Sequence, residues 1–311
     1  MYDLIGDIHG HADELEHLLQ ELGYQKTQGV YSHPEHKVVF LGDFIDRGPK
    51  IRQVLEIVRP MIEEEKALGV MGNHEFNALA YHTEDPEAEG EYLRPHSVKN
   101  TKQHSETLHQ LTPQLLGQYM KRFRKLPLWL DLEGLRVVHA CWDEQKMLEI
   151  QRGITEFKGI SDKFLAAACK KHGKLFHPVE VILKGKEVTL PPGICFNDKD
   201  GNERTEIRTR WYLSPQGHTY GTYALQSDEI ACDQELDPGV ISNAIPYPVN
   251  AKPVFVGHYW LAATQPEVLA ENVACLDYSV AKDGFLCAYR WQGEVKLSNK
   301  NFVWGKAKFQ K

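Results

Sequence analysis

Five apolar runs of this sequence are followed directly by side chains that can bind metal ions. In an extended segment, residues two positions apart point to the same side, so one cation can contact both. A single histidine after an apolar run is more often packed or solvated, and it is the recurrence that favours a metal site. Carboxylate, imidazole and amide ligands without a thiolate suit Mn, Fe or Zn. The candidate ligands are Asp7, His9, Asp43, Asn73, His139 and His258.

The apolar runs are expected to be strands that position these ligands. Residues 2–5 and 38–41 are short and mostly apolar, as expected for strands buried on both faces. Residues 12–22 and 51–58 instead place apolar side chains at helical spacing, and Pro60 is an expected helix stop. This alternation predicts βαβ units, in which sites gather at the carboxyl ends of strands. Further strands are expected at 68–71, 135–140, 254–256, 273–276 and 284–290.

Residues 42–48 and the segment that follows the third strand add groups that could act on phosphate. Arg47 can present a planar pair of donors to phosphate oxygens, and Asp43 at a strand end could bridge two cations. His74 is placed where it could protonate a leaving group. The simpler alternatives are a surface Asp-Arg turn and a helix N-cap at Asn73.

Composition and charge limit the classes of function. The chain has 311 residues, of which 42% are hydrophobic and 25% charged, as in ordinary globular proteins. Its net charge of -7 argues against binding duplex nucleic acid, although bound cations would still allow a small phosphorylated substrate. We find no secretory signal and no apolar run of membrane-spanning length. The six cysteines form no C-x-x-C pair, so reduced thiols and a cytoplasmic location are expected.

Two segments differ from the strand-helix pattern. We expect one domain over 1–311 with insertions at about 82–125 and 150–250. Residues 82–112 are polar, contain four histidines and are predicted to be exposed and partly helical. Residues 185–250 are rich in Gly, Pro, Asn and Asp and are predicted to be loops. Both insertions are expected to frame the cleft, because binding residues often lie on loops held by a rigid scaffold.

Five motifs together resemble those of a known family. They read GDIHG, GDFIDRG, GNHE, VHA and VGH, in this order along the chain. The set is similar to the calcineurin-like metallophosphoesterases, and within them to phosphoprotein phosphatases, bacterial dinucleoside tetraphosphatases and their protein-phosphatase-like relatives. The resemblance implies an α/β fold, with a β-sandwich of two mixed sheets flanked by helices, over nearly the whole chain.

The resemblance also implies a site with two divalent metal ions, with Mn expected and Fe, Zn, Ni or Co as alternatives. Asp7 and His9 would hold the first metal, and Asp43 would bridge to the second. Asn73 and His139 would bind the second metal. The two metals would stabilise both the attacking and the leaving oxygen during direct attack by an activated water molecule.

The remaining roles follow from the same resemblance. His258 would be a ligand, with each of the two late histidines serving one metal. His74 would be the general acid, oriented by Asp46, and Arg47 would clamp the phosphate. No Cys or Ser nucleophile is needed, so the expected enzyme is a hydrolase without a covalent intermediate.

The sequence departs from the family where the substrate would be recognised. Cys141 replaces a glycine of the tetraphosphatase pattern and is expected to be a packed residue. A second phosphate-binding arginine has no clear match. Besides Arg47 and Asn73, Arg210 is the nearest candidate for substrate binding, with Arg208 beside it. The alternative is that both arginines are solvated. Aromatic residues could stack a nucleobase or simply form the core: Trp211, Tyr212, Tyr220, Tyr223, Tyr259 and Trp260.

The sequence therefore predicts the type of reaction but does not identify the substrate. The expected reaction is hydrolysis of a phosphomonoester or phosphoanhydride, with phosphoproteins or dinucleoside polyphosphates as candidate substrates. The alternatives are a phosphodiesterase or RNA 5′-end phosphatase, and a non-catalytic phosphate-binding protein. The last is disfavoured because every expected ligand is present together with His74 and Arg47.

Overall fold

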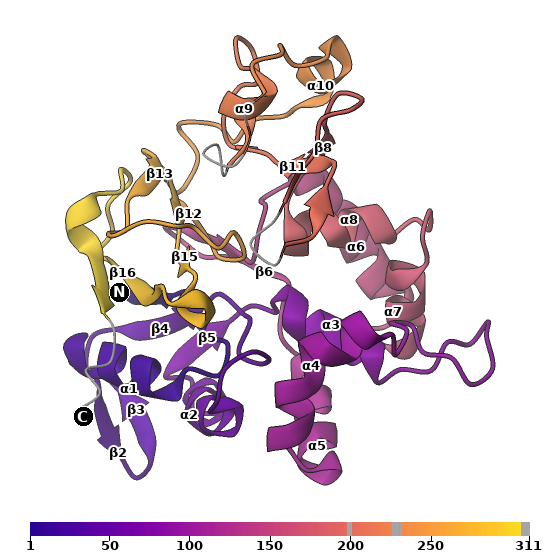
Figure 1. Cartoon of the computed structure of the whole chain (residues 1–311). Coiled ribbons are helices and arrows are strands. Elements are labelled where there is room, and N and C mark those ends of the chain that lie inside the picture. Colours follow the sequence, from indigo (N-terminus) through magenta and orange to yellow (C-terminus); the bar gives the residue numbers. More distant parts are fainter. Residues whose placement is uncertain (198–200, 226–229, 231, 306–311) are drawn as a thin grey trace. The chain divides into compact units, whose positions relative to one another are not determined.

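In the computed structural model, the first strand lies between two neighbours that run in different directions (Figure 1). Strand β1 (Tyr2–Ile5) pairs parallel with β4 (Lys37–Phe40) and antiparallel with β16 (Phe285–Trp291). Segments from the two ends of the chain thus share one mixed sheet of six strands, in the order β15-β16-β1-β4-β5 with β17 also on β16. Its other strands are β5 (Ala67–Gly69), β15 (Asp277–Tyr278) and β17 (Phe302–Gly305).

A second mixed sheet of five strands is built around β12 (Val254–Val256). This strand pairs parallel with β7 (Arg136–Val138) on one side and with β14 (Val273–Cys275) on the other. The outer strands β6 (Trp129–Asp131) and β13 (Val268–Ala270) are antiparallel to their neighbours. The carboxyl ends of β7 and β12 therefore lie next to each other.

The two sheets pack on each other through one apolar core. Leu4 and Val39 of the first sheet belong to the same buried cluster as Val137, Phe255 and Ala274 of the second. Face-to-face packing of two sheets removes the apolar side chains of both inner faces from water. The predicted sandwich of two mixed sheets is confirmed.

Helices complete the fold around these sheets. Helices α1 and α2 lie together beside the first sheet, where α1 contacts β16 and α2 contacts β5 (Figure 1). The helices of this part of the chain are α1 (Ala12–Glu21), α2 (Ile51–Glu63), α3 (Asn73–Tyr81), α4 (Val98–Gln110), α5 (Pro113–Phe123), α6 (Glu144–Glu156), α7 (Asp162–Cys169) and α8 (Phe176–Lys184), with short 3-10 turns η2 (Val280–Lys282) and η3 (Asn299–Asn301) and a hairpin of β2 (Gln25–Thr27) and β3 (Val30–Ser32).

The prediction that Pro60 stops a helix is wrong. Helix α2 continues through Pro60 to Glu63. A proline lacks one backbone N–H, but its carbonyl group can still accept. Here the Pro60 carbonyl accepts a hydrogen bond of 2.9 Å from Glu64 N, and Met61 continues the buried face of the helix.

The structure describes residues 1–197, 201–225, 230 and 232–305. The chain divides into two compact units, of which the smaller is Lys184–Ala251. The smaller unit has its own apolar core, which includes Ile207 and Tyr220. It falls within the predicted insertion at 150–250, and the assignment of 1–311 to one domain stays a prediction. Its elements are β8 (Glu187–Thr189), β9 (Phe196–Asn197), β10 (Glu203–Arg204), β11 (Glu206–Arg208), α9 (Tyr220–Tyr223) and α10 (Pro238–Asn243).

None of the helices in the described part of the chain is both long and apolar enough to cross a membrane.

Candidate metal centre

Asp43, which follows β4, lies at the centre of the predicted ligands. Its Oδ2 atom is 3.5 Å from His9 Nε2 and 3.4 Å from His139 Nε2. Asp43 belongs to two groups of potential ligands whose atoms lie within 4.8 Å of one another, one with His9 and His74 and the other with His139 and His258. A carboxylate shared by two such groups has the position that a bridging ligand requires.

Asn73 lies with both late histidines. Its Oδ1 atom is 3.0 Å from His139 Nε2 and 2.6 Å from His258 Nδ1. The two histidines follow the neighbouring parallel strands β7 and β12, which explains why they reach the same place. Both late histidines thus lie beside Asn73, and the expected division of one late histidine for each metal stays a prediction.

Several donor atoms of the cluster have the burial and orientation that binding of a cation requires. Among the described residues, Asp7 Oδ1 and His9 Nε2 are buried without a hydrogen-bond partner. His9 Nδ1 lies 3.0 Å from the Ile45 carbonyl oxygen, and His139 Nδ1 lies 2.7 Å from that of Leu41. Since a carbonyl oxygen only accepts, each Nδ1 must carry a proton, so Nε2 is the nitrogen of each ring that could bind a cation. Metal-binding histidines are commonly oriented in this way.

The charges of the cluster also favour cations. Burial, together with the neighbouring carboxylates of Asp277 and Asp43, raises the pKa of Asp7 well above its usual value. Burial also opposes ionisation of Asp43, but the surrounding histidines, with His139 first, outweigh it and hold the pKa of Asp43 well below its usual value. Burial lowers the pKa of His9 to about 3, which keeps its imidazole neutral. Burial opposes a charge on His139 as well, but the carboxylates of Asp43 and Asp7 outweigh it and raise the pKa of His139 to about 10. Divalent cations in the cluster would take the place of this positive charge and offset the repulsion between the acids.

The loops that carry the cluster have unusual backbone conformations. His9, Asp43 and His258 have positive φ angles of 44°, 53° and 69°. Asp46 and Arg47 follow with 67° and 68°. Left-handed conformations are tolerated better by Asp and His than by most residues, yet they still concentrate at functional sites, where the surrounding structure enforces them.

Glu75 enforces the conformation of one of these loops. Its carboxylate is buried and accepts hydrogen bonds from the backbone N–H groups of Asp43 at 2.8 Å, Phe44 at 2.8 Å and Gly72 at 3.0 Å. Burial and the charge of Asp43 raise the pKa of Glu75 to about 7. The acid thus ties the loop after β4 to the start of α3.

Two glycines leave room for the ligand carboxylates. A Cβ atom on Gly257 would lie 2.0 Å from Asp7 Oδ1, and one on Gly72 would lie 2.2 Å from Asp43 Oδ1. Both approaches are far closer than carbon–oxygen contact allows, so these positions of the motifs require glycine.

His74 is oriented by a carboxylate that three side chains share. His74 Nδ1 lies 2.6 Å from Asp46 Oδ2, while Asp46 Oδ1 is 2.7 Å from His104 Nδ1 and accepts from Thr107 Oγ1 at 2.5 Å. Although burial opposes ionisation, the hydrogen bonds from His104 and His74 hold the pKa of Asp46 well below its usual value. The ionised carboxylate therefore keeps the proton of His74 on Nδ1.

Residues 82–112 were expected to be exposed, and this is wrong for four of them, namely Thr83, His104, Thr107 and Leu111. His104 and Thr107 lie on α4 and are buried, with exposed fractions of 4% and 0%. The edge of α4 that carries them packs on the loop of Asp46, which shields them from water. The concentration of histidines in this polar segment was the only sequence signal for their role.

Arg47 lies against an aromatic ring. Its Cζ atom is 4.1 Å from the centre of the Trp260 ring. The backbone N–H of Trp260 donates to Asp277 Oδ2 at 2.7 Å, which fixes the position of this residue. This stacking holds the guanidinium of Arg47 near His9, where the N–H groups of Arg47 can donate hydrogen bonds to an anion.

The structure places Arg210, Cys141 and most of the aromatic candidates either in the smaller unit or in the protein core. Arg210 lies in the smaller unit, where its Nε donates to the carbonyl oxygen of Ala224 at 3.1 Å. Cys141 is fully buried. Five of the six aromatic candidates are core residues with exposed fractions of 6% or less, namely Trp211, Tyr212, Tyr220, Tyr223 and Tyr259.

The α/β sandwich carries a buried cluster of Asp, His and Asn at its strand ends, a donor set that suits a metal-binding protein. The family model for calcineurin-like phosphoesterases matches residues 2–203. The chain belongs to the calcineurin-like phosphoesterase family.

Curated relatives carry one shared name. The chain is 31% identical over 140 residues to the bis(5'-nucleosyl)-tetraphosphatase PrpE of Oceanobacillus iheyensis, covering 44% of this chain and 54% of that protein. It is 36% identical over 143 residues to the protein of the same name from Bacillus subtilis, covering 45% of this chain and 57% of that protein. The chain thus spans about half the length of the curated relatives it matches.

Solved structures show the same fold. A cold-active protein tyrosine phosphatase superposes with a TM-score of 0.52 at 19% identity, covering 93% of this chain and 73% of that one. A protein serine/threonine phosphatase from Saccharomyces cerevisiae superposes with a TM-score of 0.50 at 14% identity, covering 98% of this chain and 78% of that one.

Proposed function

We propose that the chain is a metal-dependent phosphohydrolase that cleaves a phosphomonoester or phosphoanhydride. The observation that carries this proposal is the position of Asp43 Oδ2 between His9 Nε2 and His139 Nε2, with the His74–Asp46 pair beside it. Asp7, His9, Asp43, Asn73, His139 and His258 would hold two divalent cations, for which we propose Mn. The cations, when bound, would supply Lewis-acid stabilisation of the phosphoryl oxygens and a nucleophile at neutral pH.

The side chains of this protein would perform the other steps. Arg47, held by Trp260, would bind the oxygens of the phosphoryl group that is transferred. Asn73 would contact the same group. Because Asp46 keeps a proton on His74 Nδ1, a protonated His74 would donate the proton of its Nε2 atom to the leaving oxygen.

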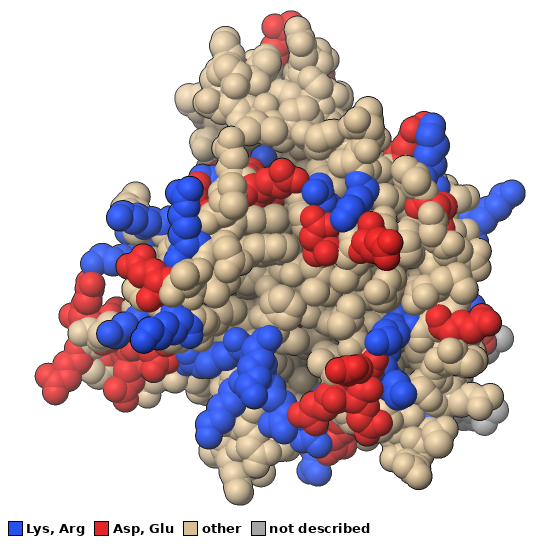
Figure 2. All heavy atoms as spheres, turned by 180° about the vertical axis from the view of Figure 1, so that it is seen from behind, with Lys and Arg blue, Asp and Glu red and all other residues tan. Residues whose placement is uncertain are grey.

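The charges at the surface agree with a small substrate or a phosphoprotein. On the face shown in Figure 2, groups of Lys and Arg side chains lie beside groups of Asp and Glu, and the net charge of the whole chain is -7. Long duplex nucleic acid is bound mainly through cations along its phosphates, which this acidic net charge disfavours. A cytoplasmic location is part of the same proposal.

A panel of substrates tests the proposal. The chain is stripped of metal with a chelator, reconstituted separately with Mn, Ni, Co or Zn, and assayed with p-nitrophenyl phosphate, a phosphopeptide, diadenosine tetraphosphate and 5′-triphosphorylated RNA. We expect turnover that depends on added metal. Absence of turnover with every metal between acid and alkaline pH would overturn the proposal, and turnover of RNA alone would favour the RNA 5′-end alternative.

A further inference from the structure

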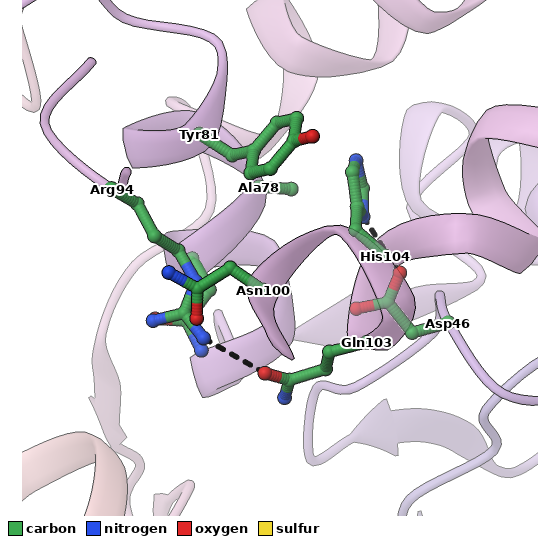
Figure 3. Close-up of a pocket in the computed structure, with 8 residues that line it drawn as sticks. Asp46, Ala78, Tyr81, Arg94, Asn100, Gln103 and His104 are labelled. Carbon is green, nitrogen blue, oxygen red and sulfur yellow. Dashed lines mark hydrogen bonds and ion pairs between the residues drawn. The ribbon is translucent and has the colours of Figure 1, made fainter. Parts of the chain in front are cut away.

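Helices α3 and α4 and the segment between them line a small pocket together with Asp46 (Figure 3). Arg94 points into it from the segment before α4, and Gln103 points into it from α4 (Figure 3). Asp46, on the loop after β4, and His104, on α4, also line the pocket. Because Asp46 also contacts His74, the pocket lies near the proposed general acid.

Arg94 is a half-buried cation without an acidic partner at hydrogen-bond distance. Its Nη1 donates to Asn77 Oδ1 at 3.2 Å and its Nη2 to Gln103 Oε1 at 2.8 Å, and both acceptors are neutral amides. Among the described residues, no carboxylate forms an ion pair with it. Burial, the main cause, lowers the pKa of Arg94, while the carboxylates of Asp46 and Glu180, which form no ion pair with it, act in the opposite direction. A partly desolvated guanidinium held by neutral groups is well suited to an anionic ligand.

Gln103 connects Arg94 to the atom that would protonate the leaving group. Its Nε2 lies 3.4 Å from His74 Nε2, and its Oε1 accepts from Arg94. Only the width of one amide group separates the two contacts. Because His74 Nδ1 is engaged by Asp46, the leaving oxygen must approach Nε2, where the amide of Gln103 now lies. Arg94 is thus on the leaving-group side of the site.

Arg47 occupies a different position in the site. It stacks on Trp260, close to His9 and therefore to the proposed metal ligands. The two arginines can then bind different parts of one substrate. Arg47 would contact the phosphoryl group that is transferred, and Arg94 would contact the group bonded to the leaving oxygen. A phosphomonoester of an alcohol has no anion at that second position, whereas a phosphoanhydride has another phosphate there.

We propose that Arg94, with Asn77 and Gln103, binds the phosphate next to the scissile bond in a phosphoanhydride. This inference rests on the proposed function and narrows its substrate to nucleoside polyphosphates or inorganic polyphosphate. The oxygen of water bonds to phosphorus, and the P–O bond to the leaving phosphate breaks with its electron pair on that oxygen. His74 Nε2 gives its proton to the leaving oxygen, the proton of the water passes to solvent, and His74 is reprotonated from solvent.

The test compares substrates within each variant. We measure kcat/KM with the Mn-loaded protein for inorganic tripolyphosphate, diadenosine tetraphosphate and p-nitrophenyl phosphate, in wild type, Arg94→Gln and Arg94→Lys. Arg122→Gln is the matched control, because Arg122 pairs with Glu63 on the surface. The readout is the ratio of kcat/KM for each phosphoanhydride to that for the phosphomonoester.

We expect Arg94→Gln to lower this ratio about 10- to 100-fold for both phosphoanhydrides, mainly through KM, as loss of a charge-assisted contact does. Arg94→Lys, which keeps the charge, should fall in between, and Arg122→Gln should leave the ratio unchanged. An unchanged ratio in a folded Arg94→Gln or Arg94→Lys protein overturns the inference. Loss with diadenosine tetraphosphate alone also overturns it, by assigning Arg94 to the nucleoside. A wild type without any turnover would instead overturn the proposed function.

Discussion

Replacing Thr107 by valine should destabilise the protein although the two side chains have nearly the same shape. The hydroxyl of Thr107 donates to Asp46 Oδ1 at 2.5 Å and accepts from Asp46 N at 3.0 Å, and the residue is fully buried. Loss of a hydrogen bond to a charged acceptor costs roughly 1.5 to 3 kcal/mol, and a buried N–H left without a partner costs roughly 1 to 3 kcal/mol. The additional buried methyl group of valine stabilises the variant by about 0.8 kcal/mol.

The expected net loss is therefore roughly 2 to 5 kcal/mol of unfolding free energy, a large part of the ~5 to 15 kcal/mol that stabilises a typical domain. It is measured by urea unfolding of the wild type and the variant, followed by tryptophan fluorescence. Thr107→Ser is the matched control, because it keeps the hydroxyl and loses only a methyl group. If valine at this position cost less than serine, the hydroxyl would not hold Asp46 and the reasoning would be refuted.

Three further outcomes are expected. His74→Asn should retain bound metal and lower kcat most for substrates with poor leaving groups; an equal loss with good and poor leaving groups would exclude general-acid catalysis. Arg47→Ala should lower kcat/KM by an amount equivalent to ~2 to 4 kcal/mol, as removal of other electrostatic groups does, and a loss below tenfold would contradict its phosphate contact. The pKa of His82 is lowered from 6.5 to about 4, first by burial and then by His104. Between these values the unfolded state takes up a proton that the folded state does not, so stability should fall as pH falls, and His82→Gln should flatten that part of the urea-unfolding profile. An unchanged slope would show that another group titrates there.

The grouping of these Asp, His and Asn side chains could be predicted because its signals are local. Asp7, Asp43 and Asn73 each follow a short apolar strand and a glycine, and parallel strands deliver such positions to the same edge of a sheet. The two late histidines could be found for the same reason. Their grouping with Asn73 could not be predicted, because it depends on β7 and β12 being neighbours in the sheet. Neither motif contains information on the order of the strands.

The surroundings of the site depend on contacts between distant segments. Thr107 is 61 positions from Asp46, and Gln103 is 29 positions from His74. Nothing in the spacing of α4 distinguishes its buried edge from a solvated polar helix, since the side chains that face the catalytic loop are themselves polar. Arg94 escaped notice likewise, because an arginine in a polar loop is usually solvated, and its neutral amide partners become visible only after folding.

Metal content tests the central claim most directly. The chain, stripped of metal and titrated with Mn, should bind two ions, as measured by calorimetry and elemental analysis. Asp43→Asn should lose binding of both, because Asp43 belongs to both groups of ligands, whereas Asp162→Asn on the exposed surface of α7 should bind as the wild type does. Binding of two ions by Asp43→Asn with unchanged affinity, or of none by the wild type, would contradict the metal centre described above.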